Sequence, residues 1–175
     1  MTIAPDEDWT WVLEAQCDAC GFDASAIACT DVAGGLRAAL AQWRAVLTTR
    51  DDVHDRPRPD VWSPLEYACH VRDVCRVYDG RVRRMLEEDG PHYANWDQDR
   101  TAVEQAYDQQ DPYGVALELT DDGTLLAQVF ESVEGDQWQR TGFRSDGAAF
   151  TIDTISRYFL HDIVHHLSDV GAAAG

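Results

Sequence analysis

The amino-acid sequence predicts an all-α fold of four or five helices packed as a bundle. Three observations lead to this fold class. Most of the chain between residues 31 and 170 places apolar side chains at three- and four-residue steps, the period of an amphipathic helix. One helix start carries a complete capping signature, and the last helix is apolar on nearly every side. A helix that is apolar all round is usually buried in the middle of a bundle.

The composition is that of one globular domain. The chain has 175 residues, of which 45% are hydrophobic and 26% are charged. Its 14 Lys and Arg against 32 Asp and Glu give a formal net charge of −18, which repels phosphate backbones and anionic membrane surfaces. We therefore expect no nucleic-acid partner and no membrane association. The acidic N-terminus lacks the features of a signal peptide, so the expected location is cytoplasmic.

The N-terminal part differs from the rest of the chain. Residues 1–30 show little periodicity, and we expect an N-terminal arm followed by a helical domain at residues 31–175. Within the arm, the segment from Trp9 to Leu13 would fit a short strand. The domain then begins with a helix from Asp31 to about Leu47, which carries apolar residues at helical spacing.

The second helix has the clearest start in the sequence. In Trp62-Ser63-Pro64-Leu65-Glu66, Ser63 caps the helix and Pro64 suits its first position. Glu66 completes a capping box with Ser63. We expect this helix to continue to about Glu88, before a Gly-Pro pair.

Two shorter predictions concern the middle of the chain. A third helix is expected from Asp99 to Gln110 with Val103 facing the interior, and a fourth from Asp111 to about Val133. The fourth helix has a weak point, a predicted kink, at Asp121-Asp122-Gly123. The polar, Gly-rich stretch from residue 134 to 149 fits either two short strands joined by a turn or an ordered loop over the mouth of the bundle.

The last helix carries a pair of candidate metal ligands. The stretch from Thr151 to Asp169 contains no Gly or Pro, and His161 and His165 stand four residues apart on one face of it. Two imidazoles at this spacing can turn a nitrogen toward one cation, as in helical zinc-binding pairs. The alternative is two core histidines bonded to nearby carbonyls or carboxylates.

A third histidine lies on the apolar face of the second helix. His70 shares that face with Val74 and Tyr78, so we expect it to point into the bundle. Asp73, one turn further along, would accept the hydrogen bond that fixes the histidine tautomer. A histidine in an apolar stripe is more often a core residue than a ligand. The case for His70 as a ligand rests on its facing the same interior as the pair on the last helix.

The five cysteines form an odd set that a cytoplasmic chain keeps reduced. Cys17 and Cys20 form a CxxC pair, which is typical of half a zinc site or of a redox pair. No second such pair lies nearby, and no strand-then-helix pattern surrounds it. The favoured interpretation is two ordinary thiols in a surface turn.

Other side chains are candidates for a pocket around the metal. Trp96 lies in a polar and aromatic loop between helices, a common place for ligand contacts. Arg140 and Arg144 would bind a substrate carboxylate or pair with local acidic residues. Tyr158 and His166 lie on the last helix, where His166 is either packed, exposed to solvent or a proton-transfer group.

The motifs Trp62-Ser63-Pro64-Leu65-Glu66…His70 and His161-Asp-Ile-Val-His165 together resemble the DinB-like family. Its superfamily includes metal-dependent thiol S-transferases and maleylpyruvate isomerase. The resemblance covers Thr30 to Val170 and implies an up-down-down-up four-helix bundle with an extra short helix. It also implies one divalent cation held by His70, His161 and His165, with zinc and nickel as the favoured metals. Family members often dimerise, so a homodimer is expected.

The resemblance supports two interpretations of function. The first is an enzyme, because three protein ligands leave a coordination position open. Its metal would activate a small thiol cofactor such as mycothiol for S-transfer to, or isomerisation of, a small electrophilic substrate, with a metal-hydroxide hydrolase as a variant. The second is a non-catalytic, metal-containing bundle that binds a small molecule or a partner. The sequence leaves catalysis and the substrate open.

Overall fold

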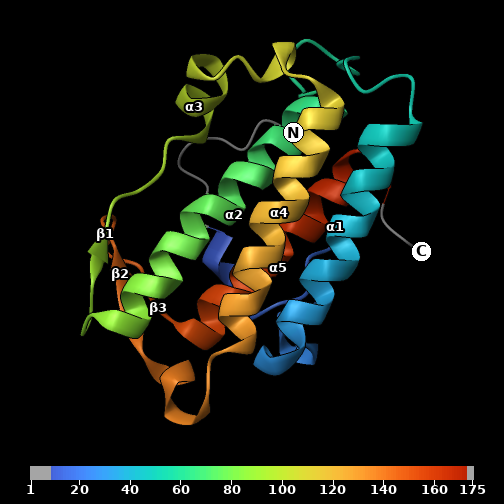
Figure 1. Cartoon of the computed structure of the whole chain (residues 1–175). Helices are drawn as coiled ribbons and strands as arrows, with labels where there is room; N and C mark the ends of the chain where they lie inside the picture. The colour runs from blue at the N-terminus through green and yellow to red at the C-terminus, as the bar shows by residue number, and fades with distance from the viewer. Residues whose placement is uncertain (1–8, 173–175) are drawn as a thin grey trace.

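Four long helices run in an up-down-down-up order, as Figure 1 shows. They are α1 (Val32–Thr49), α2 (Pro64–Glu87), α4 (Pro112–Glu131) and α5 (Ile152–Asp169). The computed structural model describes residues 9–172 of the chain. α4 packs against both α1 and α2, and α5 packs against the same two helices. The predicted fold class, an all-α four-helix bundle with an additional short helix, is confirmed.

A small sheet and a short helix lie in the long connections. β1 (His92–Tyr93) and α3 (Gln98–Glu104) belong to the crossover from α2 to α4, whereas β2 (Thr141–Arg144) and β3 (Ala149–Thr151) precede α5. β1 pairs with β2 in parallel, and β3 pairs with β2 antiparallel. Of the two alternatives for the stretch before the last helix, the structure shows two short strands joined by a turn, and β1 joins them from the loop that follows α2.

The N-terminal segment forms 3₁₀ turns rather than a strand. η1 (Trp9–Leu13) packs against α5, and η2 (Ala24–Ala26) and η3 (Cys29–Asp31) lead into α1. Val12 of η1 and Ala24 of η2 are buried, so the segment is part of the core. The strand expected at residues 9–13 is therefore wrong, while the division of the chain at residue 31 stays a prediction.

The capping box predicted for α2 is confirmed. The backbone N–H of Glu66 donates to Ser63 Oγ at 3.3 Å, and the backbone N–H of Ser63 donates to Glu66 Oε2 at 2.8 Å. Arg56 pairs with the buried carboxylate of Glu66, which satisfies its remaining oxygen. These bonds fix where α2 begins and thereby set the position of His70 inside the bundle.

The helix expected from Asp99 to Gln110 is interrupted. Ala106 adopts a left-handed conformation with φ 48°, so α3 ends before it and the short turn η4 (Tyr107–Gln109) follows. Val103, expected to face the interior, is 81% exposed. Tyr107, which was also expected to face the interior, is buried and packs the segment against the bundle.

α4 runs without a break through the predicted weak point, because Gly123 serves close packing rather than a kink. A Cβ atom at this position would lie 2.5 Å from Cδ2 and 2.7 Å from Cδ1 of Leu40 on α1. Leu40 is itself buried in the core. The absent side chain of Gly123 therefore allows α1 and α4 to approach each other.

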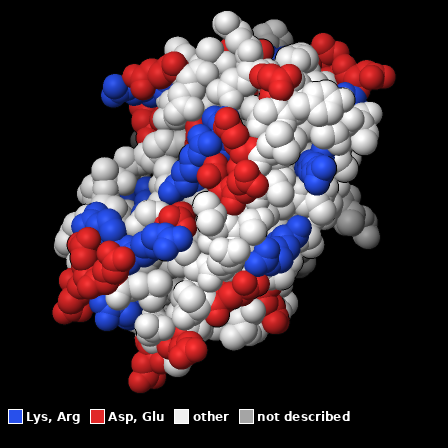
Figure 2. Space-filling view, in the orientation of Figure 1, with Lys and Arg blue, Asp and Glu red and all other residues white. Residues whose placement is uncertain are grey.

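Charged side chains of both signs gather on the surface where α2 and α4 meet (Figure 2). Arg72 and Arg76 of α2 both pair with Glu118 of α4, and Arg76 also pairs with Asp122. These pairs neutralise part of the acidic excess where the two helices meet. Within residues 9–172, no helix is long and apolar enough to cross a membrane.

We expect Gly123→Ala to lower the free energy of unfolding by about 1 kcal/mol or more, because overpacking a filled core outweighs the gain in helix propensity. Gly80 is the matched control, since it is exposed within α2 and a Cβ there meets no atom within 4 Å. Gly80→Ala should raise the free energy of unfolding by about 1 kcal/mol. Urea denaturation of both variants checks this, and equal stabilisation by both would contradict it.

Candidate metal centre

Three potential metal ligands meet between α2 and α5: His70, Asp162 and His166. One ligand atom from each lies within 4.8 Å of the other two. Nε2 of His70 is 3.8 Å and Nε2 of His166 is 3.1 Å from Oδ1 of Asp162. Asp162 and His166 stand one turn apart on α5, so both side chains reach the same space beside His70.

These separations fit a single ion. Bonds of about 2.0–2.2 Å at tetrahedral angles place neighbouring nitrogen and oxygen ligands about 3.4 Å apart. The observed distances of 3.1 Å and 3.8 Å from the carboxylate oxygen lie on either side of that value. Small side-chain shifts are therefore enough to bring the three donors onto one cation.

The buried nitrogens of this group lack hydrogen-bond partners. Among the described residues, both ring nitrogens of His70 and Nε2 of His166 have none. The 3.1 Å approach of His166 Nε2 to Asp162 is a charge contact that does not meet hydrogen-bond geometry. Burying polar atoms without partners costs free energy. A cation bound at Nε2 of His70, and at Nε2 of His166 in place of its proton, removes part of that cost, so the residues fit a metal ion.

Two carboxylates flank His166. Nδ1 of His166 donates to Oδ2 of Asp169 at 2.8 Å, while Nε2 faces Asp162. Burial acts to lower the pKa of His166, but the contacts with Asp162 and Asp169 outweigh it and raise the pKa to about 9. Burial acts to raise the pKa of Asp162, but His166 and His70 outweigh it and lower that pKa. Asp162 is therefore an anion in a largely enclosed site, as a carboxylate ligand must be.

Aromatic rings cover the ligand side chains. The ring of Trp96 stacks on His70 with centroids 5.4 Å apart and an interplanar angle of 8°. Trp62 lies 5.5 Å from the same imidazole, and Tyr67 lies 4.9 Å from the ring of His166. These contacts hold the imidazoles in place and keep bulk water away from them.

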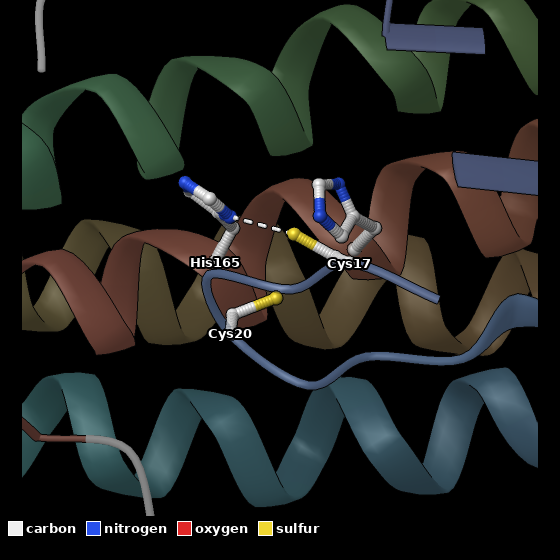
Figure 3. Close-up of side chains that lie close together, drawn as sticks. Cys17, Cys20 and His165 are labelled. Carbon is white, nitrogen blue, oxygen red and sulfur yellow. Dashed lines mark hydrogen bonds between the residues drawn. The ribbon is translucent and has the colours of Figure 1, made fainter. Parts of the chain in front are cut away.

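His161 and His165 meet the N-terminal segment instead of His70. Together with Cys17 and Cys20 they form a second group whose ligand atoms lie within 4.8 Å of one another. Figure 3 shows the two cysteines on their loop beside α5, with Sγ of Cys17 3.6 Å from Nδ1 of His165. The interpretation of both cysteines as thiols in a surface turn is wrong for Cys17, which is 2% exposed.

The structure thus divides the three predicted ligands between two groups. Successive residues of a helix are rotated by about 100°, so the pairs 161/165 and 162/166 face different directions. α5 turns the second pair toward His70 and the first toward the N-terminal segment. Asp162-Ile-Val-His-His166 has the same four-residue spacing as the predicted histidine pair, and this was the signal that pattern reasoning missed.

Asp73 does not hold the tautomer of His70, because the nitrogens of His70 have no partner among the described residues. The hydroxyl of Tyr107 donates to Oδ2 of Asp73 at 2.5 Å. Arg72 and Arg76 donate to Oδ1 of Asp73 at 2.9 Å and 3.1 Å. The carboxylate faces this network beside α4 rather than the imidazole, and its role is structural.

The two predicted substrate arginines have structural partners. Arg140 donates to the carbonyls of Met85 and Glu88 and thereby caps the end of α2. Arg144 pairs with Asp146 at 2.7 Å. These contacts favour the alternative that the sequence left open for both residues, pairing with local groups.

Tyr158 lies one turn before Asp162 on α5, where its ring packs 5.3 Å from that of Phe150 on β3. Phe150 also forms part of a surface hollow of about 390 Å³ between η1 and β3. The hollow is lined by Thr10, Trp11, Leu13, Glu14, Ala149 and Phe150, so none of the ligands of either group forms its wall.

Comparisons with known proteins agree with this fold. A family model described as the DinB superfamily matches residues 32–170. Among solved structures, YfiT from Bacillus subtilis, described as "a probable metal-dependent hydrolase with an unusual four-helix bundle topology", matches with a TM-score of 0.70. The two are 16% identical over 82% of this chain and 87% of YfiT, a likeness that shows the fold alone. No curated protein matches the chain.

We expect Asp73→Ala to lower the free energy of unfolding by about 3 kcal/mol, because it leaves buried Arg72 without its nearest counter-ion. The metal content should not change, since Asp73 does not bond to His70. Asp79→Ala on the same helix is the control, because its ion pair with Arg83 is partly exposed and contributes at most about 1 kcal/mol. Urea denaturation and metal analysis of both variants check this. Loss of metal from folded Asp73→Ala protein would show that Asp73 does orient His70.

Proposed function

This chain belongs to the DinB superfamily, and from that premise we propose that it is a metal-dependent enzyme whose divalent ion is held by His70, Asp162 and His166. The observation that carries the proposal is a set of buried, unpartnered ring nitrogens beside one carboxylate. Three protein ligands leave coordination positions open, as catalytic sites do. Two histidines and a carboxylate suit zinc, and also iron(II), while nickel accepts the same imidazole ligands.

A divalent ion in this site lowers the pKa of a bound water or thiol and polarises a carbonyl group. The chain itself supplies orientation and shielding. Asp169 binds Nδ1 of His166 and so leaves Nε2 directed at the site. Trp62 and Trp96 pack on His70 and exclude water, which strengthens charge interactions with a substrate. Tyr158, one turn before Asp162 on α5, is a further proposed pocket residue.

The attacking nucleophile comes from outside the chain. No cysteine belongs to the group around His70 among the described residues. Cys69 and Cys75, the neighbours on α2, are buried, and burial raises the pKa of Cys69 to about 12 and that of Cys75 as well. Such thiols are not nucleophiles at neutral pH. A small thiol or a water molecule is left for this role.

The proposed nucleophile is the thiolate of a low-molecular-weight thiol such as mycothiol, acting on a small electrophilic substrate. In S-transfer, the thiol loses its proton to solvent, its sulfur bonds to the electrophilic carbon, and the leaving group departs with the electron pair. In isomerisation, the sulfur adds to one carbon of a conjugated double bond and leaves again after rotation about the resulting single bond. The open ligand positions and the family of the chain support this reaction class.

Hydrolysis is the second candidate, with water in place of the thiol. It is supported by the His₂–carboxylate donor set, which zinc hydrolases also use, and by the description of YfiT. The alternative without turnover is a metal-containing bundle that binds a small molecule or a partner. The homodimer stays a prediction.

We expect His70→Ala and His166→Ala each to lower the metal content by one ion per chain, because each removes one of three ligands. His54→Ala is the matched control, since His54 is exposed and belongs to neither ligand group. Plasma mass spectrometry of untagged, folded protein measures the change. Unchanged metal in His70→Ala would refute this centre.

We expect Asp162→Asn to reduce turnover by about 100-fold or more, since even outer partners of metal ligands are worth about 10–100-fold. Two assays identify the reaction: mycothiol with chlorodinitrobenzene reports S-transfer, and a nitrophenyl ester without thiol reports hydrolysis. Activity only with thiol supports S-transfer, and activity without thiol supports hydrolysis. No turnover in either assay, with thiol binding to the metal-loaded protein, would support the non-catalytic bundle.

A further inference from the structure

Four sulfur and nitrogen donors from distant parts of the chain meet beside α5. Cys17 and Cys20 lie in the loop between η1 and η2, and His161 and His165 lie one turn apart on α5. Their ligand atoms are all within 4.8 Å of one another. Figure 3 shows both sulfur atoms on the side of the loop that faces the helix.

The loop turns sharply so that both thiols reach α5. The backbone N–H of Cys17 donates to the carbonyl of Phe22 at 2.8 Å, and that of Gly21 donates to the carbonyl of Cys17 at 2.7 Å. Gly21 has φ +76°, a conformation that glycine adopts without strain. The two cysteines stand three positions apart, the spacing with which zinc sites take two ligands from one turn.

The distances match a tetrahedral zinc site. Zn–S bonds of about 2.3 Å and Zn–N bonds of about 2.0–2.1 Å place neighbouring sulfur and nitrogen ligands about 3.6 Å apart. Sγ of Cys17 and Nδ1 of His165 are separated by 3.6 Å. This distance suits a hydrogen bond between the thiol and the imidazole, and it also equals the edge of the coordination polyhedron.

The surroundings are those of an enclosed ligand set. Nε2 of His161 is buried and has no hydrogen-bond partner among the described residues. The ring of Trp9 packs 5.1 Å from that of His161 and 4.6 Å from that of His165. On the far side of His165, Nε2 lies 3.7 Å from a carboxylate oxygen of Asp169. A carboxylate behind the imidazole is the usual outer partner of a metal-bound histidine.

Charge and donor softness select the ion. Two thiolates carry a charge of −2 and two neutral imidazoles carry none, so one divalent ion makes the buried site neutral. Two sulfur and two nitrogen donors form a closed tetrahedral set that zinc occupies in structural sites.

A redox pair is the main alternative for these cysteines, and the geometry opposes it. Both thiols are free rather than joined in a disulfide. A redox-active cysteine needs an accessible thiolate, whereas Cys17 is buried and Cys20 is half-buried. A redox pair would also leave the buried Nε2 of His161 without a partner, whereas a metal ion would bind it.

We propose that Cys17, Cys20, His161 and His165 form a second metal site, a closed structural zinc site that fastens the N-terminal segment to α5. It shares no ligand with the centre at His70 and does not depend on the proposed reaction. Bonds from His161 and His165 to the ion set the rotation of α5 about its axis. They thereby hold Asp162 and His166 on the face that meets His70.

Cobalt(II) substitution tests this site, because thiolate ligands give cobalt an intense charge-transfer absorption in the near ultraviolet that nitrogen and oxygen ligands do not. We expect this band in the wild-type protein after exchange of zinc for cobalt. Cys20→Ser should abolish the band and lower the zinc content by one ion per chain. His70→Ala should keep the band, because only the other centre loses a ligand.

Cys29→Ser is the matched control, since Cys29 is a free cysteine of the same segment but not a member of the group. It should keep both the band and the zinc. The wild-type spectrum tests the proposal even where Cys20→Ser does not fold. Absence of the band in the wild type, or full zinc retention in folded Cys20→Ser, would overturn it.

The same measurements separate this site from the proposed enzyme centre. One divalent ion per chain in total, with the band and retained in His70→Ala, supports the structural site and removes the centre at His70. One ion per chain without the band, lost in His70→Ala, supports the enzyme centre and removes the structural site.

Discussion

The burial of polar ligands on α5 is the constraint on which the rest of the structure depends. His161, Asp162, His165 and His166 lie within two turns of a helix that is otherwise packed in the core. A buried donor or acceptor without a partner is costly inside a protein, and α5 itself supplies only some of these partners, such as Asp169 for His166. α2 supplies His70 on one side, and the N-terminal loop supplies Cys17 and Cys20 on the other. Both segments therefore lie against the buried polar side chains of α5.

Asp169 lies where the two ligand groups approach each other. One of its oxygens accepts a hydrogen bond from Nδ1 of His166 at 2.8 Å, and the other lies 3.7 Å from Nε2 of His165. The same carboxylate therefore stands behind one imidazole of each group. The two groups are therefore linked through a single side chain.

Much of the fold was predictable because it rests on local chemistry. The capping box at Ser63 and Glu66 fixes the start of α2 within a few residues of sequence. A candidate metal-ligand pair on α5 was also visible, since spacing of four residues is a local property. Its partners were not, because the choice between the 161/165 and 162/166 pairs depends on which face of α5 meets α2. The role of Gly123 was hidden for the same reason, as its contact with Leu40 joins two helices far apart in sequence.

Long-range packing also explains how a CxxC turn joins the bundle. The spacing of Cys17 and Cys20 indicates a turn that presents two sulfur atoms, but nothing near them in the sequence completes a ligand set. α5 supplies the two histidines that complete this ligand set. Core packing already fixes the rotation of α5 about its axis. Trp43 contributes to this by donating from Nε1 to the carbonyl of Ile163 at 3.3 Å. Because 161/165 and 162/166 are adjacent in register, the rotation that points one pair at α2 points the other at the N-terminal segment. One rotation of α5 about its axis therefore places both ligand groups, and a different rotation would displace both.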